Sequence, residues 1–162
     1  PSARMHSSEY AASLPSSRLR AVADLARAGV PVQVMVAPVI PGLTDEEIPN
    51  ILKAAAEAGA MNAGMLLVRL PLAVAPIFQD WLARMRPDRA ERVLNRIRST
   101  RGGRLNSSEF GKRMSGEGFL SDGIADLFRV FKAKTGLTRP LPPYRTEGFR
   151  PPRPTRGQLF LF

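Results

Sequence analysis

The chain of 162 residues has no cysteine, which excludes disulfides, thiolate nucleophiles and cysteine-ligated metal clusters within it. Its single histidine, His6, lies in a Ser- and Ala-rich segment without periodicity. A histidine metal cage or a catalytic triad built on a core histidine is therefore not expected. Nucleotide P-loops, metal-binding motifs and nucleophile elbows are also missing.

Long apolar runs are missing as well. No run approaches the ~20 apolar residues that span a bilayer. The opening residues Pro-Ser-Ala-Arg-Met-His lack the apolar core of a signal peptide. We expect a cytoplasmic protein without a membrane partner. The first residue is Pro1 rather than Met, so we also expect a processed or truncated product.

Basic residues dominate the charge, and the formal net charge is +10. The segment 84–113 holds ten Lys and Arg against three Asp and Glu. This balance favours phosphates, nucleic acid or anionic surfaces. A set of solvated arginines without a partner explains it equally well, and the sequence leaves both interpretations open.

Composition divides the chain into four parts. Residues 1–17 are interpreted as disordered or loop, 18–72 as alternating helices and strands, 73–136 as wholly helical, and 137–162 as an extended Pro-rich tail. In the second part the pattern predicts a helix over 18–28, a strand over 30–37, a Pro-Gly loop, a helix ending at Gly59, and a strand over 63–70. Helices between buried strands indicate a parallel α/β sheet.

The loop over 38–45 follows the first strand, at the end where ligands bind in parallel sheets. Thr44 and Glu47 have the spacing of a capping box, so we expect them to begin the next helix, with Asp45 and Glu46 favouring the helix dipole. No acid–base role is assigned to these carboxylates.

Three apolar stripes are predicted in the helical part. The expected core positions are Ile77, Phe78, Trp81, Leu82 and Met85 in the first, Ala90, Val93, Leu94 and Ile97 in the second, and Ile124, Leu127, Phe128 and Phe131 in the third. The Arg101-Gly-Gly-Arg segment between them is interpreted as a turn. Two strands cannot bury both faces of a sheet, so we expect further strands from outside this sequence.

An ordered set of short motifs runs from about residue 18 to the end of the chain. They are Ala28-Gly29-Val30-Pro31-Val32, Pro38-Val39-Ile40-Pro41-Gly42-Leu43-Thr44-Asp45, Val68-Arg69-Leu70-Pro71, Pro87-Asp88-Arg89-Ala90, Arg101-Gly102-Gly103, Gly116-Glu117-Gly118 and Phe149-Arg150-Pro151-Pro152. The set resembles the second half of radical S-adenosylmethionine (SAM) proteins, in the spore-photoproduct-lyase-like or DNA-repair-photolyase-like group.

The resemblance implies the C-terminal portion of a partial (β/α)6 barrel, followed by a helical cap. In that family a CxxxCxxC loop near the N-terminus holds a 4Fe–4S cluster, and SAM is cleaved reductively to a 5′-deoxyadenosyl radical. The ligands of that cluster are absent from this chain. The resemblance therefore implies a missing N-terminal half of the barrel as partner, and a fragment that is inactive alone.

The resemblance also implies a cofactor site. The family's Gly-x-Ile-x-Gly-x-x-Glu signature falls on 38–45, where Ile40 and Gly42 match while Pro38 and Asp45 depart from it. The resemblance implies that Pro38, Ile40 and Gly42 are the cofactor-binding residues of this loop. Ile40 would pack on the adenine of SAM and Gly42 would allow close backbone approach. Backbone groups near Arg69 and Leu70 would frame the same pocket. By its own chemistry, Arg69 either pairs with a carboxylate or faces an anionic ligand.

Arg89, Arg92 and Arg96 recur at helical spacing and are expected to share one face, opposite Val93 and Ile97. That face is the candidate for nucleic acid, with a solvated outer helix as the alternative. The leading hypothesis is the C-terminal half of a radical SAM enzyme. The alternative is a small basic nucleic-acid-binding protein without catalysis, and a truncated gene product without a separate function is the third.

Overall fold

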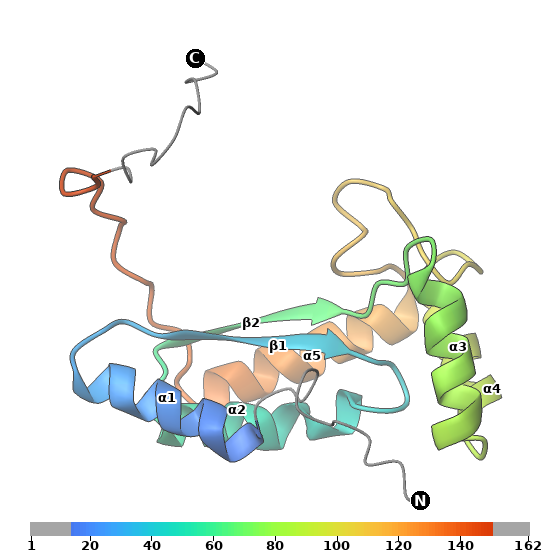
Figure 1. The fold of residues 1–162 in the computed structure, drawn as a ribbon, viewed down its shortest axis with the longest axis horizontal. Coiled ribbons are helices and arrows are strands. Elements are labelled where there is room, and N and C mark those ends of the chain that lie inside the picture. Colours follow the sequence, from blue (N-terminus) through green and yellow to red (C-terminus); the bar gives the residue numbers. More distant parts are fainter. Residues whose placement is uncertain (1–13, 151–162) are drawn as a thin grey trace, which may run out of the picture.

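The computed structural model describes residues 14–150 and confirms the α/β class with two parallel strands (Figure 1). The elements in chain order are α1 (Pro15–Arg27), β1 (Gln33–Val39), the 3-10 helix η1 (Asp45–Glu47), α2 (Ile48–Glu57), β2 (Asn62–Leu67), α3 (Val74–Met85), α4 (Ala90–Ser99) and α5 (Phe119–Lys134). His6 and the end of the tail lie outside the described residues.

Pairing of β1 with β2 is interrupted by a bulge. Val36 is opposite Met65, but Val39 is opposite Leu67, so β1 carries one more residue than β2 between these pairs. Because side chains alternate along a strand, the additional residue lets Val36 and Val39 both face the core.

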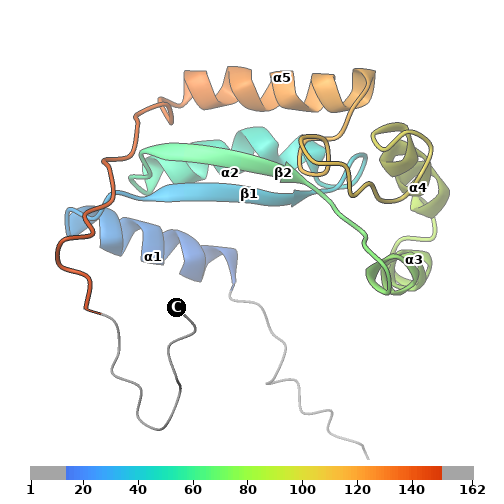
Figure 2. The same ribbon diagram turned by 90° about the horizontal axis from the view of Figure 1, so that it is seen from above.

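Only one face of the sheet is covered. Helices α1, α2 and α5 lie on the same side of the strands (Figures 1 and 2). On that side Val36 and Leu67 pack with Leu52 of α2 and Phe128 of α5. On the other side Met35 is 53% exposed, although the sequence predicted a sheet buried on both faces. Among residues 14–150 nothing covers this second face.

The outer edge of β2 is closed by the chain's own segments. Leu67 N donates to the Met114 carbonyl and Arg139 N donates to the Met61 carbonyl. At Ala63, the backbone N–H donates to the Asn62 side chain and the carbonyl accepts from Lys132 Nζ. The outer edge of β1 makes no backbone pair within residues 14–150. An unpaired edge of this kind is a template on which another strand can pair.

Helix α1 lies beside β1, on the side away from β2 (Figure 2). None of its residues is buried, and Leu25 is 46% exposed. It begins at Pro15, three residues before the expected start, because proline is well suited to the first helical position. Val22 packs against the first core, and the helix extends beyond the edge of the sheet.

A second core lies at the carboxyl ends of the strands, where α3 and α4 pack together. Leu82, Val93 and Ile97 are fully buried there beside Val68 and Leu70. The predicted core stripe of α3 is largely wrong, because Ile77 is 67%, Trp81 39% and Met85 62% exposed. Only one side of α3 faces α4, so a stripe as wide as the predicted one cannot be buried.

Helix α5 confirms the third predicted helix and buries Ile124 and Phe128 in the first core. Residues 139–150 form no helix or strand and are exposed. Among the described residues, no helix combines the length and apolar character needed to cross a membrane.

Candidate ligand site at the carboxyl ends of the strands

The loop after β1 holds its shape through its own side chains. Thr44 Oγ1 accepts from Ile40 N at 2.8 Å, and Asp45 Oδ1 accepts from Gly42 N at 2.8 Å. Neither side chain caps a helix, and Glu47 makes no capping bond. The capping-box prediction is therefore wrong: a 3-10 turn intervenes, and α2 begins only at Ile48. These polar groups fix the loop instead of starting the helix.

Gly42 is buried beneath an arginine of the helical cap. Its φ is +82°, which an L side chain rarely adopts, and an added Cβ would lie 2.7 Å from Arg96 Cδ. The close approach that the sequence predicted at Gly42 is thus made by Arg96. Arg96 Nη1 also lies 3.9 Å from Asp45 Oδ2, whose side chain is only 13% exposed. Arg96 therefore joins α4 to the loop after β1.

The remaining residues of the predicted adenine site differ in accessibility. Pro38 is exposed at the bulge of β1, and Ile40 is half-buried against the α3–α4 core. Leu70 is 2% exposed and belongs to that core, so only its backbone remains for a ligand. The structure brings the loop and the segment after β2 to the same end of the sheet, while the assignment to SAM stays a prediction.

Arg69 makes no ion pair with any carboxylate of residues 14–150. Its Nε is buried without a hydrogen-bond partner. Of the two interpretations that the sequence left open for Arg69, carboxylate pairing is not observed in the described residues. The Nε of Arg69 is thus an unsatisfied buried donor, which is costly.

Arg101 is a buried cation that sequence reasoning missed. It is 3% exposed, and its guanidinium donates to the Val68 carbonyl at 2.9 Å and to the Lys112 carbonyl at 3.0 Å. Burial lowers the pKa of Arg101, and the nearby Arg69 guanidinium lowers it further, whereas Glu117 opposes both effects. The Arg-Gly-Gly-Arg segment is a turn as predicted, but nothing in its pattern signals a buried arginine.

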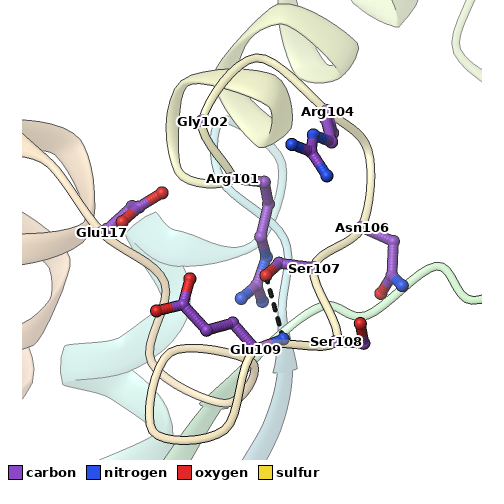
Figure 3. A pocket seen from close by; sticks show the side chains of 8 residues that line it. All are labelled: Arg101, Gly102, Arg104, Asn106, Ser107, Ser108, Glu109 and Glu117. Atoms are coloured by element: carbon purple, nitrogen blue, oxygen red, sulfur yellow. Dashed lines mark hydrogen bonds between the residues drawn. The ribbon is translucent and has the colours of Figure 1, made fainter.

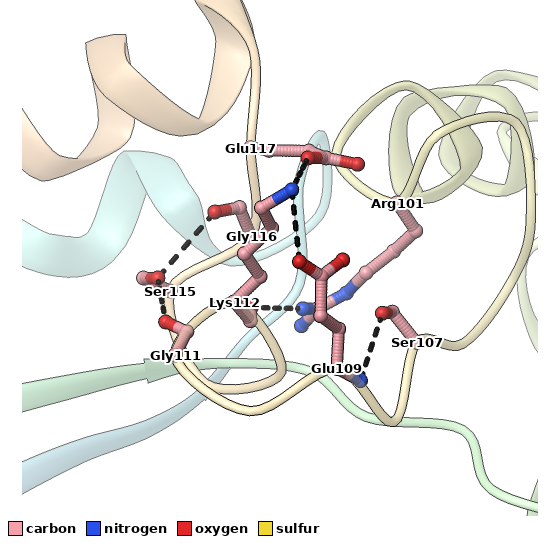
Figure 4. A network of polar contacts seen from close by, with 8 residues as sticks. All are labelled: Arg101, Ser107, Glu109, Gly111, Lys112, Ser115, Gly116 and Glu117. Atoms are coloured by element: carbon pink, nitrogen blue, oxygen red, sulfur yellow. Dashed lines mark hydrogen bonds and ion pairs between the residues drawn. The ribbon is translucent and has the colours of Figure 1, made fainter.

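Lys112 pairs with two carboxylates beside this arginine (Figure 4). Its Nζ lies 3.1 Å from both Glu117 Oε2 and Glu109 Oε1. The hydrogen bonds to Glu117 and then to Glu109 raise the pKa of Lys112. The network fixes the loop between α4 and α5 over the end of β2.

The three arginines proposed for nucleic acid do not form one open face. Arg92 is exposed on α4, Arg89 precedes the helix with its Nε 3.5 Å from Asp88, and Arg96 is directed to the loop after β1. The expected burial of Val93 and Ile97 opposite them is confirmed. Helical spacing placed Arg96 correctly on the helix but could not show that another segment lies over it.

Groups of three or more His, Asp or Glu side chains that could hold a metal ion are not found among residues 14–150. With no cysteine in the sequence, this chain provides no ligand set for a 4Fe–4S cluster.

Comparisons with known proteins give relatives but no function. No family model matches the chain, and neither does any solved structure. The chain is 32% identical over 131 residues to uncharacterized proteins of Mycobacterium bovis and of two strains of Mycobacterium tuberculosis. The match covers 80% of this chain but 36% of each relative. The chain thus spans little more than a third of the length of the curated relatives it matches.

Proposed function

We propose that the chain is the C-terminal part of a radical SAM enzyme of the photolyase-like group, with β1 and β2 as the last two strands of a partial (β/α)6 barrel. The observation that carries the proposal is the asymmetry of the sheet. The edge of β2 is closed by the chain itself, and the edge of β1 is open. A terminal pair of barrel strands has this arrangement, since preceding strands would add beside β1.

Two further features agree with a barrel. In a barrel, helices form the outer layer and the other face of the sheet lines the interior. The described residues likewise place helices on one face of the sheet and leave the second face uncovered. Helix α1 lies where a crossover helix between β1 and a preceding strand would pack, and its exposed Leu25 would then meet that strand. The match covers 36% of each relative, so the rest of such a protein is long enough to contain the other strands of a barrel.

The residues present fit the implied cofactors unequally. A 4Fe–4S cluster does not fit, because the chain has no cysteine to bind it. One side of a SAM site fits in part: Pro38 is accessible, Ile40 is half-buried and Arg69 has an orphaned donor at the same end of the sheet. Gly42 is covered by Arg96 and would act by shaping the loop rather than by touching the ligand.

Genomic DNA gives the first test. An in-frame CxxxCxxC upstream of residue 1 is expected, and its absence, with frameshifts allowed for, would reject the proposal in its simple form.

The second test is equilibrium dialysis of the chain with SAM. Saturable binding that weakens in Arg69→Gln but not in Arg92→Gln would support the proposed site. The variant Gly42→Asp is unsuitable, because both its φ and the contact with Arg96 would disturb the loop.

The alternative of a nucleic-acid-binding protein without catalysis has less support in the structure, since Arg96 is committed to the loop. It predicts that the isolated chain binds single strands or duplexes with an affinity that falls steeply with salt. Such binding together with no response to SAM would favour this alternative.

A further inference from the structure

A polar cavity of about 300 Å³ opens beside the carboxyl end of β2 (Figure 3). It is formed by the turn after α4 and the loop that follows, and it lies outside the loop over 38–45, where the resemblance implies SAM. Arg101, Arg104, Asn106, Ser107 and Ser108 contribute to its wall. Side chains of this kind offer guanidinium, amide and hydroxyl donors to a single ligand.

The cavity has a built cationic floor. Arg101 is 3% exposed, and its Nε is buried without a hydrogen-bond partner. A buried guanidinium with one unpaired N–H is costly, and an anion beside it would offset part of that cost. Asn106 Oδ1, in the same wall, is a buried acceptor without a partner and adds no donor for an anion.

Glu109 and Glu117 also line the cavity and would repel an anion if they were free. They are not free, because Lys112 Nζ lies 3.1 Å from a carboxylate oxygen of each (Figure 4). Arg104 has no carboxylate within ion-pair distance among residues 14–150. Its guanidinium points into the space between Arg101 and Ser107 (Figure 3). The charge left available to a ligand is therefore positive.

We propose that this cavity binds a phosphate group, with Arg104 and the Ser108 hydroxyl as direct donors and Arg101 as the buried cation behind them. Guanidinium groups recognise phosphate oxygens through paired, charge-assisted hydrogen bonds. The phosphate belongs either to a small phosphomonoester or to a nucleic-acid backbone, because both present the same oxygens. This inference needs neither the barrel nor SAM and is independent of the proposed function.

The test is isothermal titration of the 162-residue chain with inorganic phosphate, at an ionic strength held constant with chloride. Saturable binding is expected, weakened about tenfold in Arg104→Gln by loss of one charge-assisted contact. Ser108→Ala should weaken it less. Arg92→Gln is the matched control, because it removes the same charge from an exposed site on α4. Arg104 and Ser108 are exposed, so these variants should fold.

Two competition arms identify the source of the phosphate. Displacement by glycerol 3-phosphate, with no binding of a single-stranded oligonucleotide lacking terminal phosphates, assigns the site to a small phosphomonoester. Oligonucleotide binding that inorganic phosphate displaces and Arg104→Gln abolishes assigns it to a backbone. The proposal is overturned if phosphate does not saturate the chain, or if Arg92→Gln and Arg104→Gln weaken binding equally.

Discussion

The side chain of Arg96 lies across Gly42, so that a Cβ on the glycine would be 2.7 Å from Arg96 Cδ. This contact joins the α4 helix of the cap to the loop that follows β1. It also explains Gly42 without a ligand, since φ is +82° there and the space above it is occupied. The glycine, the arginine and Asp45 act as one structural unit that fixes the candidate site.

Gly42→Ala should therefore destabilise the chain through two separate effects. The positive φ costs about 1–2 kcal/mol for an L side chain, and displacement of Arg96 adds to it. Gly29→Ala is the control, because Gly29 has φ +77° and no atom within 4 Å of an added Cβ. Urea unfolding should show a larger loss at Gly42, and Arg96→Ala in the same chain should reduce that loss to the value for Gly29. Equal losses of unfolding free energy in Gly42→Ala and Gly29→Ala would show that the Arg96 side chain moves aside without a cost in stability.

The loop bonds of Thr44 give a second prediction. Thr44→Val removes the acceptor of the Ile40 N–H, a part-buried bond of 2.8 Å, and should cost about 1–2 kcal/mol in the free energy of unfolding. Glu47→Ala should cost close to nothing, because Glu47 is exposed and caps no helix. A capping box would give comparable losses in both variants, so measuring the pair by urea unfolding decides between the two arrangements.

Arg101 should tolerate no substitution that shortens its reach. Arg101→Lys retains the charge but cannot hold the carbonyls of Val68 and Lys112 together, as one planar guanidinium does. We expect a loss of about 2–4 kcal/mol in the free energy of unfolding, because a buried cation would be left partly unsatisfied. Arg104→Lys is the control at an exposed position of the same turn and should change stability little. Losses of equal size would mean that Arg101 is not a structural link.

The pH dependence of stability follows from Lys112. Its pKa is raised in the folded chain by Glu117 and Glu109, so the ammonium form is favoured on folding. This stabilisation is complete below the unfolded pKa of about 10.4 and is lost as pH rises through the higher folded value. The melting temperature of wild type should exceed that of Lys112→Gln at pH 8, and the difference should shrink toward pH 11. A constant difference would contradict the pairing, since other titrating groups are common to both proteins.

The periodicity of apolar residues predicted the features of the fold that depend on neighbouring residues in the sequence. The helices, the two strands and their parallel order followed from apolar spacing and from Gly and Pro positions, and the burial of Val93 and Ile97 followed in the same way. The errors lie where distant segments meet. Thr44 has the spacing of a cap but bonds to Ile40, and Trp81 is 39% exposed on α3 although Leu82 beside it is buried against α4.

The candidate site shows the same limit. The position of the loop at the carboxyl ends of the strands could be predicted, because parallel sheets place it there. The contact of Arg96 with Gly42, 54 positions apart by their numbers, could not, because nothing local to α4 records it. Arg101 looks in the sequence like any turn arginine, and only the packing of β2 against the later loop buries it.

Adjacent residues of β1 test the open face of the sheet. Met35 is 53% exposed on the uncovered side, whereas Val36 is 6% exposed under α2 and α5. Met35→Lys should change the free energy of unfolding by less than about 1 kcal/mol, because a lysine stem can lie along the sheet with its ammonium in water. Val36→Lys should cost more than about 3 kcal/mol, since it buries an unpaired charge. Urea unfolding of both variants measures the contrast. If Met35→Lys is as damaging as Val36→Lys, the second face is covered in solution by this chain or another copy of it.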